Sequence, residues 1–188
     1  MEKNKFYIPL MDDNIIRDDV NAVIEFLQQD PIPKLTNGPK VKELESKWSN
    51  WLGVKHSLMV NSGTAANELT ILALTHMYDD GEIILPPLTW ISDISSILFT
   101  NFDPVFVDIN HTNLSFDIDH LKDSITDKTR AIFLTHVLGI NGITDELISL
   151  CKERNILLIE DVCESHGATF KDKKCGSIGF ASNFSFYF

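Results

Sequence analysis

The sequence has few cysteines, a shortage of basic residues and no long hydrophobic run. Its three cysteines, Cys151, Cys163 and Cys175, form no CxxC pair, so we expect reduced thiols and no metal site. Lys and Arg number 16 against 27 Asp and Glu, a formal net charge of −11, which argues against nucleic acid or an anionic membrane as the main partner. The opening MEKNKFYIPL holds no apolar run long enough for a signal peptide, and no stretch approaches a membrane span. These absences predict a cytoplasmic protein.

The apolar residues show helical spacing first and then a regular alternation of strands and helices. Two helices are predicted, from Ile16 to Leu27 and from Val41 to Leu52. The strands predicted after them are Ser57–Val60, Glu82–Leu85, Pro104–Asp108, Ala131–His136 and Ile156–Glu160. The helices predicted between these strands are Thr64–Met77, Ile91–Thr100, Ile118–Ile125 and Asp145–Arg154. The pattern ends with a hairpin over Gly167–Cys175 and a last strand over Phe180–Phe186, whose aromatic alternation continues to Phe188.

This alternation is typical of an α/β fold with a largely parallel sheet between layers of helices. We expect residues 1–188 to form a single domain with an amino-terminal helical segment. A Rossmann-like dehydrogenase would fit the same alternation, but the nine glycines form no G-x-G-x-x-G fingerprint. The Gly-Lys-Ser/Thr of a P-loop is missing as well.

Two polar motifs follow predicted strands. In the segment VNSGTAAN, small residues around Gly63 and Thr64 open a helix, where free N–H groups and the helix dipole suit a phosphate. The segment is equally consistent with an ordinary helix start capped by Ser62 or Thr64. In ILLIED, an apolar strand delivers Glu160 and Asp161 to its carboxyl end, where ligands bind in open α/β sheets. A cap or loop acid that faces water remains the alternative.

Two further candidates complete the set. Trp90 comes directly after the strand and turn ILPPLT, where an aromatic ring can stack on a planar ligand, although a lone tryptophan is more often simply packed. Ser185 lies in the predicted last strand, and its alternative is an outward-facing strand serine. A phosphate cradle, a stacking aromatic and a buried acid are together what pyridoxal phosphate (PLP) requires.

The motifs NSGTAAN, PPLTW, VFVDI, IEDVCESHGA and NFSFYF resemble, in order and spacing, the sugar-nucleotide aminotransferase family DegT/DnrJ/EryC1/StrS of fold type I PLP enzymes. The resemblance runs from about Ile8 to the last residue. It implies a three-layer large domain with a seven-stranded, mainly parallel sheet, which would be incomplete at the carboxy end here.

The resemblance also implies roles for individual residues. Gly63, Thr64 and Ser185 would bind the phosphate of PLP or of its amine form, pyridoxamine phosphate. Trp90 would stack on one face of the pyridine ring, with Cys163 near the other face. Asp161 would pair with the ring nitrogen and keep it protonated, as a carboxylate favours a nearby cation. For His166, which belongs to the same motif, we expect a structural role.

One position departs from the family pattern. Family aminotransferases usually carry Gln three residues after the aspartate, where this chain has Glu164, which we expect in the cofactor site and as a possible catalytic group. Together with the tail SFYF, this residue resembles a branch of sugar 3-dehydratases in which histidine replaces the catalytic lysine. The family's Lys or His would fall two residues beyond Phe188, so we expect the amino-terminal part of a longer enzyme. Lys171, Lys173 and Lys174 could substitute, but a polar hairpin favours solvent exposure.

The resemblance finally implies a function. We expect a PLP-dependent aminotransferase that acts on a nucleotide-linked 4-keto deoxysugar in cell-surface polysaccharide, lipopolysaccharide or deoxysugar biosynthesis. The partners would be a nucleotide sugar, an amino donor such as glutamate and, at full length, a second copy of the chain. The alternatives are a PLP-dependent 3-dehydratase of the same family and, in another class, an inactive or partner-dependent fragment. Without its Lys or His, the 188-residue chain should not catalyse the reaction alone.

Overall fold

The computed structural model of the chain describes residues 15–186, which fall into two compact units that divide between Leu44 and Glu45. The first unit contains α1 (Arg17–Leu27), and α2 (Pro39–Leu52) runs from the first unit into the second. Both predicted helices are confirmed. The Asp19 side chain accepts a hydrogen bond from the Ile16 N–H at the start of α1, and Gly53 ends α2 with φ +84°. None of the helices in this described part of the chain is long and apolar enough to cross a membrane.

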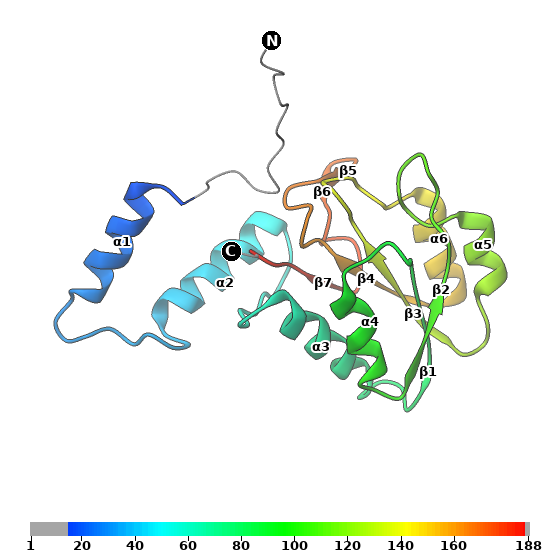
Figure 1. Cartoon of the computed structure of the whole chain (residues 1–188), viewed down its shortest axis with the longest axis horizontal. Helices are drawn as coiled ribbons and strands as arrows, with labels where there is room; N and C mark the ends of the chain where they lie inside the picture. Colours follow the sequence, from blue (N-terminus) through cyan, green and yellow to red (C-terminus); the bar gives the residue numbers. More distant parts are fainter. Residues whose placement is uncertain (1–14, 187–188) are drawn as a thin grey trace, which may run out of the picture. The chain divides into compact units, whose positions relative to one another are not determined.

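A five-stranded parallel sheet forms the centre of the second unit (Figure 1). Its strands are β1 (Gly81–Leu85), β2 (Phe102–Phe106), β3 (Thr129–Thr135), β4 (Leu157–Asp161) and β7 (Ala181–Asn183). They lie in the order β2-β1-β3-β4-β7, and all four pairings are parallel. Pro104 lies in β2 at one edge of the sheet, where a strand tolerates a residue without an N–H.

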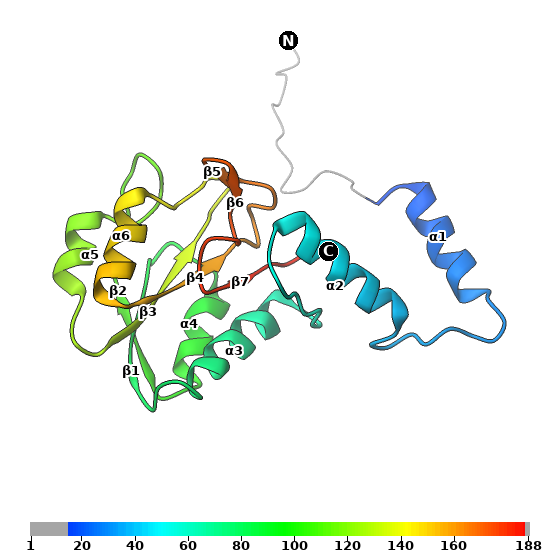
Figure 2. The same ribbon diagram turned by 180° about the vertical axis from the view of Figure 1, so that it is seen from behind.

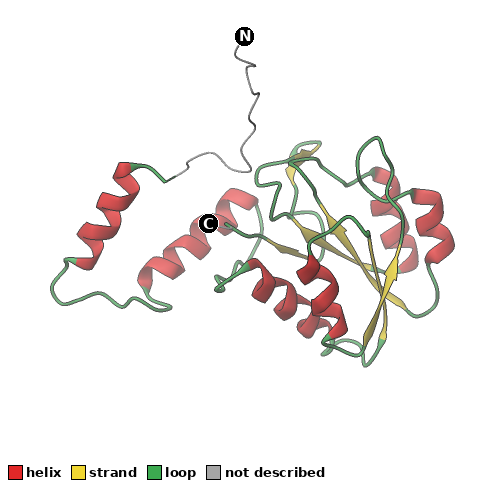
Figure 3. Ribbon diagram, in the orientation of Figure 1, coloured by secondary structure: helices red, strands yellow, loops and turns green. Residues whose placement is uncertain are grey.

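Helices cover both faces of this sheet and make three layers (Figures 1 to 3). The helices α3 (Gly63–Leu74) and α4 (Ile91–Leu98) lie on one face, and α5 (Ile118–Ser124) and α6 (Asp145–Arg154) lie on the other. The strand residues alternate between the two resulting cores, as the two-residue period of a strand requires. Ile83, Leu85, Ala131, Phe133 and Ile159 pack with α3 and α4, while Ile84, Ile132, Leu134 and Leu158 pack with α5 and α6. The predicted α/β fold is therefore confirmed.

Two strand predictions need correction. Ser57–Val60 is not a strand, because no described strand runs beside it and its apolar side chains point outward, with Leu58 85% exposed. A hydrogen bond of 2.9 Å from the Met59 N–H to Glu45 Oε1 instead attaches this segment to α2. The last strand, predicted over Phe180–Phe186, covers only Ala181–Asn183. The hairpin is confirmed as β5 (Thr169–Phe170) and β6 (Lys173–Lys174).

The aromatic residues after β7 leave the sheet because they find another apolar surface. Phe184 and Phe186 both pack edge-on against Trp48 of α2, with ring centroids 5.2 and 5.3 Å apart. The Phe184 ring also covers Gly176, where a Cβ would lie 2.5 Å from the Phe184 Cζ. Phe188, the third member of the alternating run, lies outside the described residues.

Candidate functional site

The first element of the candidate site is the start of α3. Ser62 caps this helix, and its side chain accepts a hydrogen bond of 3.1 Å from the Ala65 N–H. The N–H groups of Gly63 and Thr64 belong to the first turn and therefore have no intrahelical partner. Gly63 is tightly enclosed, because a Cβ there would lie 2.8 Å from Ser185 Cβ and 3.4 Å from Cys163 Sγ. The fold therefore brings Gly63, Cys163 and Ser185 together from three separate motifs.

Asp161 ends β4 with its side chain on the α3 and α4 face of the sheet. Only 2% of the residue is exposed. Its Oδ1 accepts a hydrogen bond of 2.8 Å from the Cys163 N–H, and its Oδ2 lies 3.5 Å from Asn67 Nδ2 of α3. Cys163 thus connects the buried acid to the enclosed glycine at the helix start. Burial, together with the charge of Asp161, raises the pKa of the Cys163 thiol far above its usual range, so the thiol stays neutral.

Sequence reasoning missed a second buried acid, Asp93, which is fully buried beside Asp161. Its Oδ1 accepts a hydrogen bond of 2.6 Å from Asn67 Nδ2, and its Oδ2 contacts the hydroxyls of Thr89 and Thr135. The available signal was the position of Asp93 four residues before Ile97, on the inward face of an amphipathic helix. An acid at such a position has to find polar partners inside the protein.

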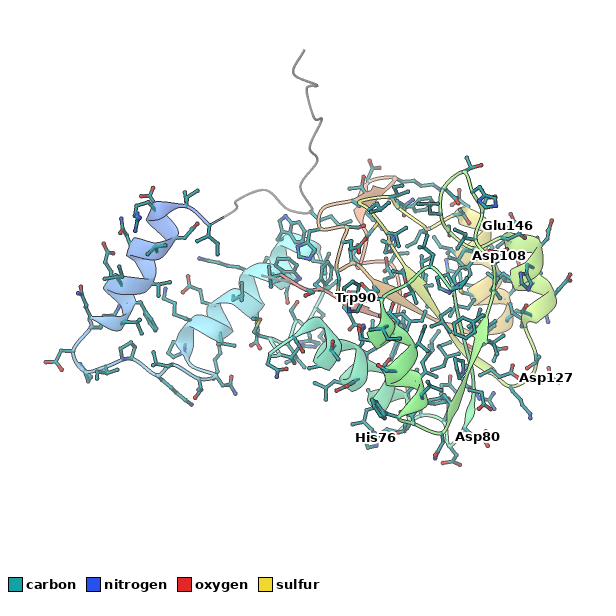
Figure 4. The ribbon with its side chains drawn as sticks, viewed as in Figure 1. His76, Asp80, Trp90, Asp108, Asp127 and Glu146 are labelled. Atoms are coloured by element: carbon teal, nitrogen blue, oxygen red, sulfur yellow. The ribbon has the colours of Figure 1, made fainter. Side chains whose placement is uncertain are left out.

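Trp90 adjoins this acidic centre through its neighbour in the chain, Thr89. It lies at the first turn of α4, on the side of the sheet where the strands end and away from Asp80 and His76 (Figure 4). The residue is 52% exposed. Part of this residue therefore faces solvent near the carboxyl ends of the strands.

Glu164 and His166 contact other parts of the chain than Asp161 and Gly63 do. Glu164 is exposed, and its Oε2 accepts a hydrogen bond of 3.0 Å from the Leu138 N–H in the loop after β3. The His166 ring packs against Trp48, Phe184 and Phe186 with centroids 5.4 to 5.6 Å away, and burial lowers its pKa. A cofactor role for Glu164 stays a prediction, and so does a structural role for His166, with which these ring contacts agree.

The three hairpin lysines contact groups other than the two buried acids, Asp93 and Asp161. Lys171 and Lys173 are exposed, and Lys171 Nζ lies 2.6 Å from Asp145 Oδ1. Lys174 is half-buried, with Nζ 5.2 Å from the centre of the Trp51 ring. Exposure is therefore the rule for this hairpin, as predicted, and none of these contacts involves Asp161.

Glu160, the neighbour of Asp161, serves the opposite face of the sheet. It is fully buried and accepts hydrogen bonds from His136 Nε2 (3.1 Å) and from the N–H groups of Gly176 (2.7 Å), Ile178 (3.0 Å) and Gly179 (2.7 Å). Burial alone would raise the pKa of this carboxyl, but the hydrogen bonds from His136 and the two glycine amides outweigh it and lower the pKa. Glu160 is therefore a charged structural anchor for the segment between β6 and β7.

A cavity of about 210 Å³ lies in a different part of the second unit and is lined by residues that include Tyr78, Arg130 and Arg154. None of the predicted site residues contributes to it. Its position gives it no share in the chemistry of the two buried acids.

The residues at the strand ends fit a phosphorylated pyridine such as PLP. The start of α3 offers free N–H groups and leaves no room for a side chain at Gly63. Asp161 supplies a buried carboxylate for a ring nitrogen, and Trp90 supplies a half-exposed ring. Within residues 15–186, Asn67 Oδ1 is also a buried polar atom with no hydrogen-bond partner, next to the two acids. The fold is that of the large domain of fold type I PLP enzymes.

The chain belongs to the DegT/DnrJ/EryC1/StrS aminotransferase family, which it matches over residues 13–188. It is 32% identical to GDP-perosamine synthase of Escherichia coli O157:H7 over 181 residues, 96% of this chain and 49% of that protein. It is 36% identical to GDP-4-keto-6-deoxy-D-mannose 3-dehydratase of Escherichia coli O55:H7 over 158 residues, 81% of this chain and 41% of that protein.

The fold of solved family members is similar as well. The crystal structure of the Escherichia coli 3-dehydratase with bound hydrated PLP superposes with a TM-score of 0.83 at 34% identity, covering 91% of this chain and 44% of that one. The chain therefore spans about half the length of the curated relatives it matches. Both aminotransferases and 3-dehydratases occur among these relatives.

Proposed function

We propose that this chain forms the cofactor-binding part of a PLP-dependent enzyme that acts on a nucleotide-linked 4-keto deoxysugar, with glutamate as amino donor. The observation that carries the proposal is the continuous set of contacts from Gly63 and Ser185 through Cys163 to Asp161. These contacts, together with the turn that carries Thr89 and Trp90, support a phosphate site beside a buried carboxylate at the carboxyl ends of one sheet.

Each residue of this set has a physical task. The N–H groups of Gly63 and Thr64 and the Ser185 hydroxyl bind phosphate, and the dipole of α3 adds partial positive charge. Asp161 holds a proton on the ring nitrogen, and Trp90 covers one face of the ring and excludes water. When bound, the cofactor supplies an electron sink for chemistry beside the substrate's carbonyl carbon.

A 3-dehydratase of the same family is the second candidate, and the observation that favours it is Glu164 at the position where family aminotransferases usually carry Gln. The two reactions differ in their products. With a 4-keto sugar nucleotide and glutamate, a complete enzyme that transaminates gives a product with an added amino nitrogen, whereas a dehydratase gives one that has lost the C3 hydroxyl. Mass spectrometry of the product distinguishes them.

Binding of pyridoxamine phosphate tests the cofactor assignment. This form is the suitable probe, because it cannot react with exposed lysines as PLP does. We expect calorimetric binding to the chain, together with quenching of tryptophan fluorescence that the Trp90→Ala variant loses. Asp161→Asn keeps the shape of the side chain and should weaken binding about tenfold to a hundredfold, the range for loss of a charge-assisted hydrogen bond. Pyridoxamine without phosphate is the matched ligand control, and equal affinity for both ligands or in both chains would contradict the proposal.

A further inference from the structure

Next to Asp161, oxygen atoms of three side chains contact one another and form a closed ring. Thr89 Oγ1 and Thr135 Oγ1 lie 2.6 Å apart, and Thr135 Oγ1 lies 3.1 Å from Asp93 Oδ2. A short hydrogen-bond contact between Thr89 Oγ1 and Asp93 Oδ2 closes the ring. All three residues sit where α4 begins and β3 ends, beside Asp161.

The number of protons decides how this ring holds together. Three oxygen–oxygen contacts need three protons, and the two threonine hydroxyls supply one each. If Asp93 were a carboxylate, one of the contacts would bring lone pairs against lone pairs at a site where Asp93 is fully buried and Thr89 partly buried, at a cost comparable to an unmade hydrogen bond. A proton on Asp93 Oδ2 completes the ring, while Asp93 Oδ1 still accepts from Asn67 Nδ2.

We propose that Asp93 is a protonated positioning residue, which leaves Asp161 as the single carboxylate of the buried pair and fixes the turn that carries Trp90. The inference rests on the proposed function only for its consequence: the site then presents one negative charge to one pyridinium.

The surroundings of the pair agree with this distribution of charge. The titratable groups that face Asp93 are Asp161 at the end of β4 and Cys163 just beyond it, while α3 offers only the amide of Asn67. Burial, followed by the charge of Asp161 and a hydrogen bond with it, raises the pKa of Asp93 to about 8, although the hydrogen bonds from Thr89 and Thr135 act in the opposite direction. Asp161 accepts from the Cys163 N–H and shares the Asn67 amide with Asp93.

Infrared spectroscopy of the cofactor-free chain tests the proposal. A protonated carboxylic acid has a carbonyl stretching band well separated from that of a carboxylate. We expect this band in the wild-type chain at pH 7, its loss in Asp93→Asn and its persistence in Asp103→Asn, a matched change of an exposed aspartate in β2. The band should fade as the pH rises past about 8.

Two results would overturn the proposal: no such band in the wild-type chain at pH 7, or a band that survives in Asp93→Asn. If Asp93→Asn does not fold, Thr135→Val decides instead: it removes a hydroxyl that contacts Asp93, so it should shift the frequency of the band if the proton sits on Asp93 and leave the band unchanged if the proton sits on Asp161. The measurement needs no cofactor. Failure of pyridoxamine phosphate binding and failure of the band therefore remain separate outcomes.

Discussion

Asp161 and its neighbour Glu160 are adjacent in β4, but their carboxyl groups lie on opposite faces of the sheet and have different partners. Both are buried, yet Glu160 faces α5 and α6 with four hydrogen-bond donors around it, and Asp161 faces α3 and α4 beside a second acid. A fully bonded carboxylate is a stable anchor, whereas an acid with an acidic neighbour is held for a ligand or a proton. The chemistry of each carboxyl follows from the face of the sheet on which it lies.

Because Asp93 is protonated in the folded protein and ionised in the unfolded chain, it should make stability depend on pH. Between the ordinary pKa of 3.8 and the raised value of about 8, the folded state binds one more proton than the unfolded state. The contribution of this group therefore falls as the pH rises through this range, by up to about 1.4 kcal/mol per pH unit. Urea unfolding at pH 5, 6 and 7 should show this slope as the difference between the wild-type chain and Asp93→Asn. A difference that does not change with pH would contradict it.

The crowding at Gly63 gives a second prediction. Gly63→Ala places a Cβ 2.8 Å from Ser185 Cβ, so one of the two segments has to move, and we expect a loss of about 1–3 kcal/mol in the free energy of unfolding. Ser185→Gly removes the obstructing atoms and should restore most of this loss in the double variant. Denaturant unfolding of the four chains gives the coupling energy. If the effects of the two changes simply add, the proximity of Gly63 and Ser185 is not the cause.

Some of these residues could be identified from the sequence and others could not. Trp90 and Asp161 lie just after or at the end of strands that form as predicted, and the ends of parallel strands meet at one edge of a sheet. Gly63 is predicted from its motif of small residues, although the strand predicted before it, Ser57–Val60, does not form. Asp93 lies inside a predicted helix, and nothing in the sequence pairs it with Thr135 at the end of another predicted element. Their ring with Thr89 joins two segments separated by up to 46 residues, and only tertiary packing brings them together.

At the scale of elements, hydrophobic pattern predicts a strand only where a neighbour exists to pair with it. The segments around β1, β3 and β4 are flanked on both sides and form as predicted. Ser57–Val60 has the same apolar pattern, but it has no described strand beside it and stays irregular. The alternation of Phe184 and Phe186 is satisfied by Trp48 instead of by a sheet. In both cases the alternation of apolar residues correctly indicates an apolar surface, but whether a strand forms depends on the neighbour that is available to pack or pair with it.

Glu160 gives the prediction that belongs to this scale, because it joins β4 to the segment between β6 and β7. Glu160→Gln keeps the volume but replaces one acceptor oxygen by a donor that faces N–H groups, so we expect a loss of about 3 kcal/mol or more in the free energy of unfolding. Since the pKa of Glu160 is lowered in the fold, its contribution is present at neutral pH and is lost as the pH falls through that lowered pKa.

Thermal and urea unfolding at pH 7 measure this loss. Glu153→Gln, an exposed change on α6, is the matched control and should leave stability within about 0.5 kcal/mol. An equal loss in the free energy of unfolding for Glu160→Gln and Glu153→Gln would show that Glu160 does not anchor the segment between β6 and β7.

At the scale of the whole molecule, the chain spans about half the length of the curated relatives it matches. The contacts that carry the proposed function lie between residues 62 and 185. The amino-terminal unit contributes α1, whose apolar stripe is exposed, with Val23 57%, Ile24 45% and Leu27 47% accessible. No residue of α1 is buried.

An exposed apolar stripe of this kind predicts that the 188-residue chain associates with itself. Val20, Val23, Ile24 and Leu27 recur at helical spacing on one side of α1, and burial of one such side chain stabilises a complex by about 1.5–3 kcal/mol. Val23→Lys should therefore weaken association by roughly tenfold to a hundredfold. Asn21→Lys adds the same charge on the polar side of the same helix and should change association little. Sedimentation equilibrium at several protein concentrations measures both variants against the wild-type chain. A wild-type chain that stays monomeric at every concentration, or equal effects of the two lysines, would show that the stripe on α1 does not drive association.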